Sequence, residues 1–181
     1  MSELLTSEPA SVASAPASAA LATLPEGAPD FDFLHGRWRG KNRRLRERLV
    51  GCNEWEESDC TLDCRPLLGG LANVEEYRST HLPDFVAMTV RVFDPKAKQW
   101  AIHWADNRYG TLDPPMRGGF QGDLGIFSGA DFHQGRAILC RFHWHRGTPT
   151  NPGPRWEQAF SADGGQTWET NWTMDFVRLD E

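Results

Sequence analysis

The chain has 181 residues, a formal net charge of -6, 39% hydrophobic residues and 24% charged residues. This length suits one ordinary domain, and the balance of apolar and charged residues is that of a globular protein. The negative net charge disfavours binding to nucleic acid through charge alone. No apolar run approaches the roughly 18 residues that would span a bilayer. We therefore expect neither nucleic acid nor a membrane as a partner.

Residues 1–29 are rich in Ala, Ser and Pro, a composition that predicts a disordered tail. A secretory signal peptide needs a basic start and an apolar core. This chain starts with acidic residues, and Pro9 and Pro16 interrupt its apolar stretch. We therefore expect a cytoplasmic protein whose folded domain covers residues 30–181. In the reducing cytoplasm we expect its four cysteines to remain free and mostly structural: Cys52, Cys60, Cys64 and Cys140.

From residue 31 onward the sequence predicts one short helical turn at 31–36, ended by Gly36, followed only by strands. Gly, Pro, Asn and Asp separate stretches in which polar and apolar residues alternate. Antiparallel strands that follow one another through hairpins can bury their apolar faces by closing into a barrel. The fold class is therefore all-β, a single antiparallel up-and-down β-barrel of about ten strands. The predicted strands lie near residues 37–49, 53–65, 70–80, 85–94, 98–106, 117–122, 124–129, 135–146, 154–162 and 167–178.

The first predicted hairpin is densely charged. Its basic side chains face a strand rich in Glu and Asp, and opposite charges paired across two antiparallel strands stabilise each other. We interpret this hairpin as charge-paired and solvated rather than as an anion-binding patch. The basic residues are Arg37, Arg39, Lys41, Arg43, Arg44, Arg46 and Arg48, and the acidic residues are Glu54, Glu56, Glu57, Asp59 and Asp63.

The later strands have one apolar, aromatic face and one polar face, so alternation predicts which side chains enter the barrel. Concave, mostly apolar cavities with few polar groups are the usual form of small-molecule sites. We predict such a cavity here, with Gln158 orienting the ligand. Its predicted lining is Met88, Trp104, Phe142, Trp144, Trp156, Gln158, Phe160, Trp172 and Met174.

The polar faces offer two alternatives. If the faces were inverted, Arg141, His143, Glu157 and Asn171 would form a polar set in the barrel, with Glu157 as a general base and His143 as its acid partner. Inversion would expose the tryptophans, so we favour a cross-strand ion pair between Arg141 and Glu157. His143 and His145 share one strand face and could bind a metal. Because Arg141 opposes a cation there, we expect a solvated surface and no metal or cofactor.

Gly36-Arg37-Trp38 is a G-x-W motif at the start of the first predicted strand, and Arg178 lies near the end of the last one. The motif resembles the first signature of the lipocalins and related calycin barrels. This resemblance implies that Trp38 packs across the floor of the barrel. It also implies that Arg178 is the basic side chain that stacks over the Trp38 ring. The Thr-Asp-Tyr turn of the second lipocalin signature is absent.

Beyond this motif, the stretch from Phe31 to Arg178 resembles a bacterial family of uncharacterised lipocalin-like domains, a group of domains of unknown function. That resemblance implies a closed barrel and leaves the activity open. The matching motifs are Phe33-Leu34-His35-Gly36-Arg37-Trp38, Leu68-Gly69-Gly70, Phe93-Asp94-Pro95, Gln99-Trp100, Trp104-Ala105-Asp106, Trp156-Glu157-Gln158 and Ser161 to Trp168.

The segment from Ser161 to Trp168 also matches the Asp-box of sialidase-like propellers. A propeller needs several blades of about 40 residues or more, and this chain has a single copy of the motif. We interpret it as a hairpin device in which Asp163 accepts backbone N–H bonds and Trp168 packs over the turn.

These observations favour a lipocalin-like barrel that binds a small, largely apolar molecule. Two other functions stay open at this point. One is an enzyme that uses the polar Arg, His, Glu and Asn set inside the barrel. The other is an interaction module that forms a homodimer through an apolar patch on the outside of the barrel.

Overall fold

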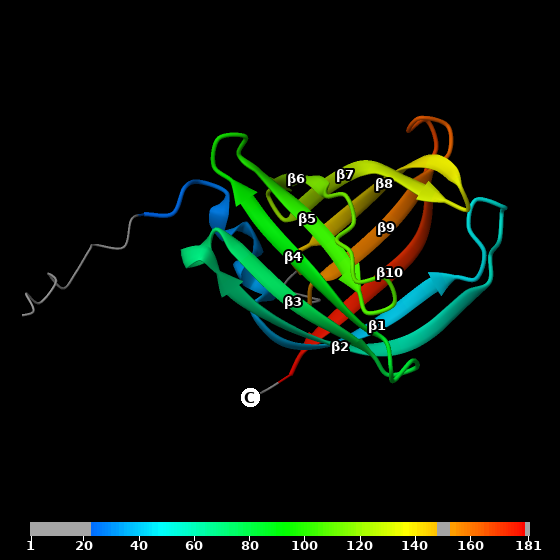
Figure 1. The fold of residues 1–181 in the computed structure, drawn as a ribbon, viewed down its shortest axis with the longest axis horizontal. Helices are drawn as coiled ribbons and strands as arrows, with labels where there is room; N and C mark the ends of the chain where they lie inside the picture. Colours follow the sequence, from blue (N-terminus) through cyan, green and yellow to red (C-terminus); the bar gives the residue numbers. More distant parts are fainter. Residues whose placement is uncertain (1–22, 148–152, 180–181) are drawn as a thin grey trace, which may run out of the picture.

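The computed structural model describes residues 23–147 and 153–179, which form a closed antiparallel β-barrel (Figure 1). Each strand pairs with its neighbours in the chain, and β1 pairs with β10 to close the barrel. The predicted up-and-down barrel is therefore confirmed. The strands are β1 (Gly36–Leu45), β2 (Trp55–Leu67), β3 (Ala72–Ser79), β4 (Val86–Asp94), β5 (Gln99–Asp106), β6 (Met116–Gln121), β7 (Leu124–His133), β8 (Arg136–His145), β9 (Arg155–Ser161) and β10 (Glu169–Arg178). Two short 3-10 helices accompany them, η1 (Ala28–Leu34) and η2 (Leu68–Gly70).

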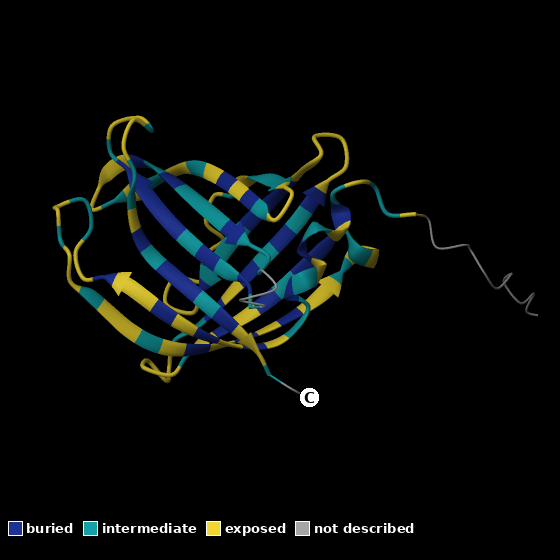
Figure 2. Ribbon diagram, turned by 180° about the vertical axis from the view of Figure 1, so that it is seen from behind, coloured by how far each residue is buried: buried dark blue, intermediate teal, exposed yellow. Residues whose placement is uncertain are grey.

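Alternation along the strands separates the inside of the barrel from the outside. In β1, Trp38 and Asn42 are buried, whereas Arg37, Arg39 and Lys41 between and beside them are exposed. Figure 2 shows the same alternation of buried and exposed residues along this part of the barrel. Because successive side chains of a strand point to opposite faces, one face of each strand forms the core.

Helix η1 closes one end of the barrel (Figure 1). The predicted helical turn is present, but it begins earlier than expected and ends at Leu34, and Gly36 is the first residue of β1. Phe31 is completely buried, and its ring lies edge-on to Trp100 and Phe120, with centroids 5.1 Å away in each case. The helix therefore acts as an aromatic plug.

The folded domain starts before residue 30, where the sequence placed its boundary. The indole nitrogen of Trp100 donates a hydrogen bond of 2.9 Å to the carbonyl oxygen of Gly27. Ala28 is buried, and Leu24 packs against the core. Residues 1–22 of the predicted tail lie outside the described residues. No helix in the described ranges is long and apolar enough to cross a membrane.

Removing residues 1–29 should lower the melting temperature by several degrees. The deletion leaves the buried Trp100 indole without its acceptor on Gly27, and an unsatisfied buried donor costs about 1–3 kcal/mol. Thermal unfolding of this variant should be compared with that of a chain lacking only residues 1–22, so that the difference reports on residues 23–29. Equal melting temperatures for the two truncated chains would contradict the docking of this segment.

Trp38 in the first strand and Arg178 in the last strand form a contact that we call the clamp. The guanidinium of Arg178 lies 4.2 Å from the centre of the Trp38 ring, which confirms the predicted contact. Arg178 also donates to the carbonyl oxygen of His35 at 2.9 Å, and the Trp38 indole donates to that of Leu34 at 2.8 Å. Gly36 has a φ of 112°, and a Cβ there would lie 2.6 Å from Arg178. The positive φ favours glycine at this position of the G-x-W motif, and a larger residue would also displace the end of the Arg178 side chain.

The Asp-box segment is a hairpin device, as expected. The Asp163 carboxylate accepts backbone N–H bonds from Gln166 and Thr167 and a hydroxyl bond of 2.6 Å from Thr167. These bonds to Thr167, together with one from Ser161, hold the pKa of Asp163 below its usual range. The Trp168 indole packs over the turn and donates to the carbonyl oxygen of Gly165.

Candidate functional site

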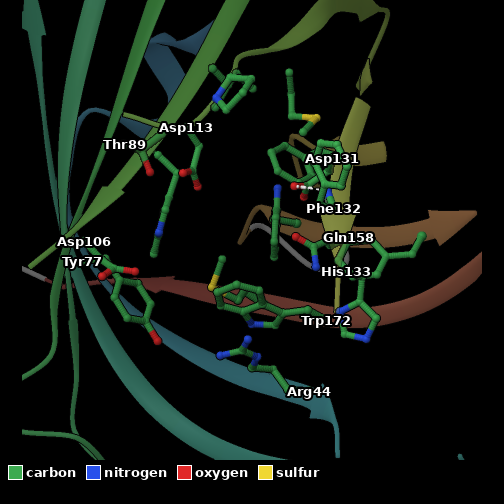
Figure 3. A pocket seen from close by; sticks show the side chains of 18 of the residues that line it. Arg44, Tyr77, Thr89, Asp106, Asp113, Asp131, Phe132, His133, Gln158 and Trp172 are labelled. Atoms are coloured by element: carbon green, nitrogen blue, oxygen red, sulfur yellow. Dashed lines mark hydrogen bonds between the residues drawn. The ribbon is translucent and has the colours of Figure 1, made fainter. Parts of the chain in front are cut away.

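A cavity of about 500 Å³ occupies the barrel interior (Figure 3). The highly exposed side chains of Tyr109 and Phe132 belong to its lining, so the cavity reaches the surface at the end opposite η1. Eight of the nine residues predicted to form the site line this cavity: Trp104, Phe142, Trp144, Trp156, Gln158, Phe160, Trp172 and Met174.

Met88, the ninth predicted residue, lies on the outer face of the barrel instead. It is 38% exposed, whereas its neighbours Ala87 and Thr89 are buried. Both faces of β4 carry apolar residues, since Val90 and Val92 share the outer face with Met88. Hydrophobicity therefore could not identify the inner face of this strand, which carries the buried cation of Arg91.

Aromatic rings form a continuous wall along one side of the cavity. The ring centroids of Phe142 and Trp156 are 5.0 Å apart, and those of Trp156 and Trp172 are 5.1 Å apart. Trp104 contacts Trp172 edge-on from the other side of the barrel. Edge-to-face contacts between rings are favourable beyond simple burial, so this wall is preformed for an apolar ligand.

Gln158 is held by an unexpected partner. Its amide nitrogen donates to the Asn171 side-chain oxygen at 2.9 Å. Asn171 was predicted to face solvent, but it is fully buried. The register of β10 against β9 shifts between Thr170 and Trp172, so Asn171 sits in a bulge. A bulge re-aims the side chain of the extra residue, and here it fixes the amide of Gln158.

The cavity also holds charged residues that sequence reasoning missed. Arg91 and Glu75 form a buried ion pair of 2.9 Å, and Arg108 binds Asp106 at 2.7 Å. Alternation could have indicated these positions, because Glu75 is two residues from the inward Tyr77. Eight charged side chains line the cavity: Arg44, Arg48, Glu75, Arg91, Asp106, Arg108, Asp113 and Asp131.

Two basic residues assigned to the solvated hairpin, Arg44 and Arg48, line the cavity instead. The predicted charge pairing is confirmed for Lys41, which forms an ion pair with Glu57, and for Arg46, which forms one with Glu54. Both ion pairs lie on the outside of the barrel. Arg44 lies on the same face of β1 as Trp38 and Asn42, so alternation directs it inward.

The polar set considered for catalysis does not converge in the cavity, and none of its four members belongs to the cavity lining. The expected ion pair between Arg141 and Glu157 is wrong. Glu157 accepts instead from Arg155 at 2.7 Å, and the Arg141 guanidinium lies 4.2 Å from the centre of the Trp168 ring. Asn171 is engaged with Gln158.

One cluster has the composition of a metal site. Donor atoms of His143, His145 and Glu157 lie within 4.8 Å of one another. Burial, and then the charge of Arg141, lowers the pKa of His143. A neutral imidazole is the ligand form, and one oxygen of the Glu157 carboxylate also pairs with Arg155. A metal ion held by the three residues would therefore lie beside the positive charge of Arg155.

All four cysteines are free. Burial raises the pKa values of Cys60 and Cys64 to about 12, and it raises that of Cys140 as well. Thiolates are the nucleophilic and metal-binding form of cysteine. These three thiols therefore remain protonated parts of the core.

Comparison with known proteins adds no family assignment. The chain matches no model of a known protein family, and it matches no curated protein. The functional conclusion therefore depends on the geometry of the cavity.

Proposed function

We propose that this protein binds a small, largely apolar molecule inside a lipocalin-like, calycin-type barrel. The observation that carries the proposal is the cavity of about 500 Å³ with its aromatic wall. Sites for small molecules commonly measure about 300–1,000 Å³ and combine apolar walls with a few placed polar groups. Gln158, whose amide nitrogen is fixed by Asn171, supplies one such group.

Two features support the calycin kinship and the cytoplasmic location within this proposal. The contact between Trp38 and Arg178 is the one that the resemblance implies. The four free cysteines suit a reducing compartment. An enzyme built on Arg141, His143, Glu157 and Asn171 receives no such support, because these side chains do not meet in the cavity.

Binding of the uncharged fluorophore N-phenylnaphthylamine tests the proposal. The ligand should bind within the barrel and accept excitation energy from the lining tryptophans. Met174→Trp should lower its affinity about tenfold or more, because Met174 lines the cavity and a larger side chain fills the space. Fluorescence titration measures the affinity, and thermal unfolding establishes that the variant is folded.

Val177→Trp is the matched control, because Val177 lies on the same strand and is 59% exposed on the outside of the barrel. This variant should bind the fluorophore like the unmodified protein. Equal affinities for both folded variants would contradict binding in the cavity. Mass spectrometry of the native protein, purified without denaturation, then identifies a natural ligand that remains bound.

A further inference from the structure

Arg44 presents a cation to the cavity and forms no ion pair with an acidic side chain among the described residues. Its guanidinium lies 4.2 Å from the centre of the Trp172 ring. The ion pairs of this hairpin within the described chain involve Lys41, Arg43 and Arg46 instead. Arg44 is an exposed residue of β1 whose side chain also lines the cavity. Burial, followed by the charge of Arg48, lowers the pKa of Arg44 to about 10.

Two further nitrogen atoms without partners gather around one aromatic ring nearby. The Arg48 guanidinium carbon lies 5.6 Å from the Phe160 ring centroid, and the His133 ring centroid lies at the same distance. Arg48 Nε and His133 Nε2 are both buried, and neither has a hydrogen-bond partner among the described residues. These two nitrogen atoms are covered by protein, whereas other atoms of the Arg48 and His133 side chains line the cavity. Arg48 therefore brings a second cation to the cavity, close enough to Arg44 for its charge to act on that group.

The loop that carries Arg48 is fastened in place. The backbone N–H of Leu49 donates to a carboxylate oxygen of Glu169 at 2.8 Å. Leu49 has a φ of 62°, a left-handed conformation that is uncommon for a residue other than glycine. Glu169 is the acid whose charge acts most on Arg48, but it forms no ion pair with Arg48 in the described chain, and one of its oxygens already binds Leu49.

The remaining charges leave the positive potential on one wall. Arg91 and Arg108 are neutralised by their own carboxylate partners. Asp113 and Asp131 lie on the side of the cavity opposite Arg44 (Figure 3). Burial raises the pKa of Asp113, and the charge of Asp131 raises it further. The raised pKa favours the neutral form of Asp113, which then repels an anion less, and the cations of Arg44 and Arg48 attract an anionic ligand group to their side of the cavity.

We propose that the cavity takes an amphipathic organic anion, with its apolar body against the tryptophan wall and its carboxylate or sulfonate between Arg44 and Arg48, beside His133. This inference rests on the proposed function and specifies the class of ligand. Guanidinium groups match planar or tetrahedral oxyanions with several donors at once. The anion offers acceptors to the guanidinium groups of Arg44 and Arg48 and relieves the repulsion between the two cations.

The test compares two probes that share an apolar body, anilinonaphthalene sulfonate and uncharged N-phenylnaphthylamine. The sulfonate should bind the unmodified protein at least about tenfold more tightly, since hydrogen bonds to charged groups are strong. Arg44→Met and Arg48→Met should each weaken sulfonate binding about tenfold and leave binding of the uncharged probe within about twofold. Retained binding of the uncharged probe shows that each variant keeps a folded cavity.

Arg46→Met is the matched control, because Arg46 belongs to the same hairpin but pairs with Glu54 and Glu56 outside the barrel. It should leave both affinities unchanged. If the uncharged probe binds but the sulfonate gains nothing from Arg44 and Arg48, the anion site is wrong and the ligand-binding function stands. If neither probe binds, both proposals are wrong. If Arg46→Met weakens sulfonate binding as much as Arg44→Met and Arg48→Met do, general attraction to the surface charge explains the binding, and the proposed site is wrong.

Discussion

Arg91→Met should lower the free energy of unfolding by about 3–5 kcal/mol, because it leaves the Glu75 carboxylate without its partner inside the barrel. Arg91 is 1% exposed and Glu75 is 4% exposed. One Arg91 nitrogen donates to Glu75 at 2.9 Å, and another donates to Asn73 at 3.0 Å. The guanidinium also lies 5.1 Å from the centre of the Phe31 ring, so it joins the cavity floor to the plug of helix η1.

Chemical denaturation measures this effect, and the neighbouring surface pair gives its control. Arg78 and Glu76 also belong to β3 and lie 2.7 Å apart, but both are exposed. Arg78→Met should cost no more than about 1 kcal/mol. The double variant Arg91→Met with Glu75→Leu should recover much of the lost stability, because it removes the uncompensated charge. A loss for Arg91→Met no larger than that for Arg78→Met would contradict the role of the buried pair.

Trp38→Ala should also cost about 3–5 kcal/mol, the usual loss when a large buried aromatic side chain is removed. Trp38 is 5% exposed and holds the end of η1 through its bond to the Leu34 carbonyl oxygen. Arg178→Ala should cost less, although Arg178 contributes more than a cation–π contact. It also donates to the carbonyl oxygens of Phe33 and His35, so the loss should reach about 1–3 kcal/mol.

A double-mutant cycle distinguishes this clamp from two separate contributions. Because the two side chains touch and hold the same helix, the double variant should lose less than the sum of the single losses. The pair of Arg43 and Trp55 is the comparison, since its guanidinium stands 5.2 Å from the ring on the outside of the barrel. Its coupling should be smaller. Purely additive losses for Trp38 and Arg178 would contradict the clamp and weaken the kinship with the calycins.

The sequence alone sufficed for the barrel and for most of the cavity wall. A period of two and turn residues between the strands are local signals, so each of the ten strands could be predicted from its own residues. Trp156 and Trp172 each stand between two polar neighbours, and burial of large aromatic side chains then decides their direction. The contact between Trp38 and Arg178 was expected from the resemblance of the G-x-W motif to the lipocalins, and the structure confirms that contact.

Only the tertiary structure decided how charge is arranged in the cavity. Alternation along β1 indicates that Arg44 points inward, but its aromatic support comes from Trp172 on the far end of the chain. Arg48 belongs to a loop that is held by Glu169, and no local pattern specifies that contact. Asn171 turns inward because of a bulge that shifts the register of β10 by one residue. Partners from distant segments therefore determine the positions of these side chains. A long basic side chain can pack its stem on an aromatic ring and keep its charge accessible. The sequence therefore determined the barrel fold and most of the apolar cavity wall, and contacts between distant segments determined where the charged and polar groups of the cavity lie.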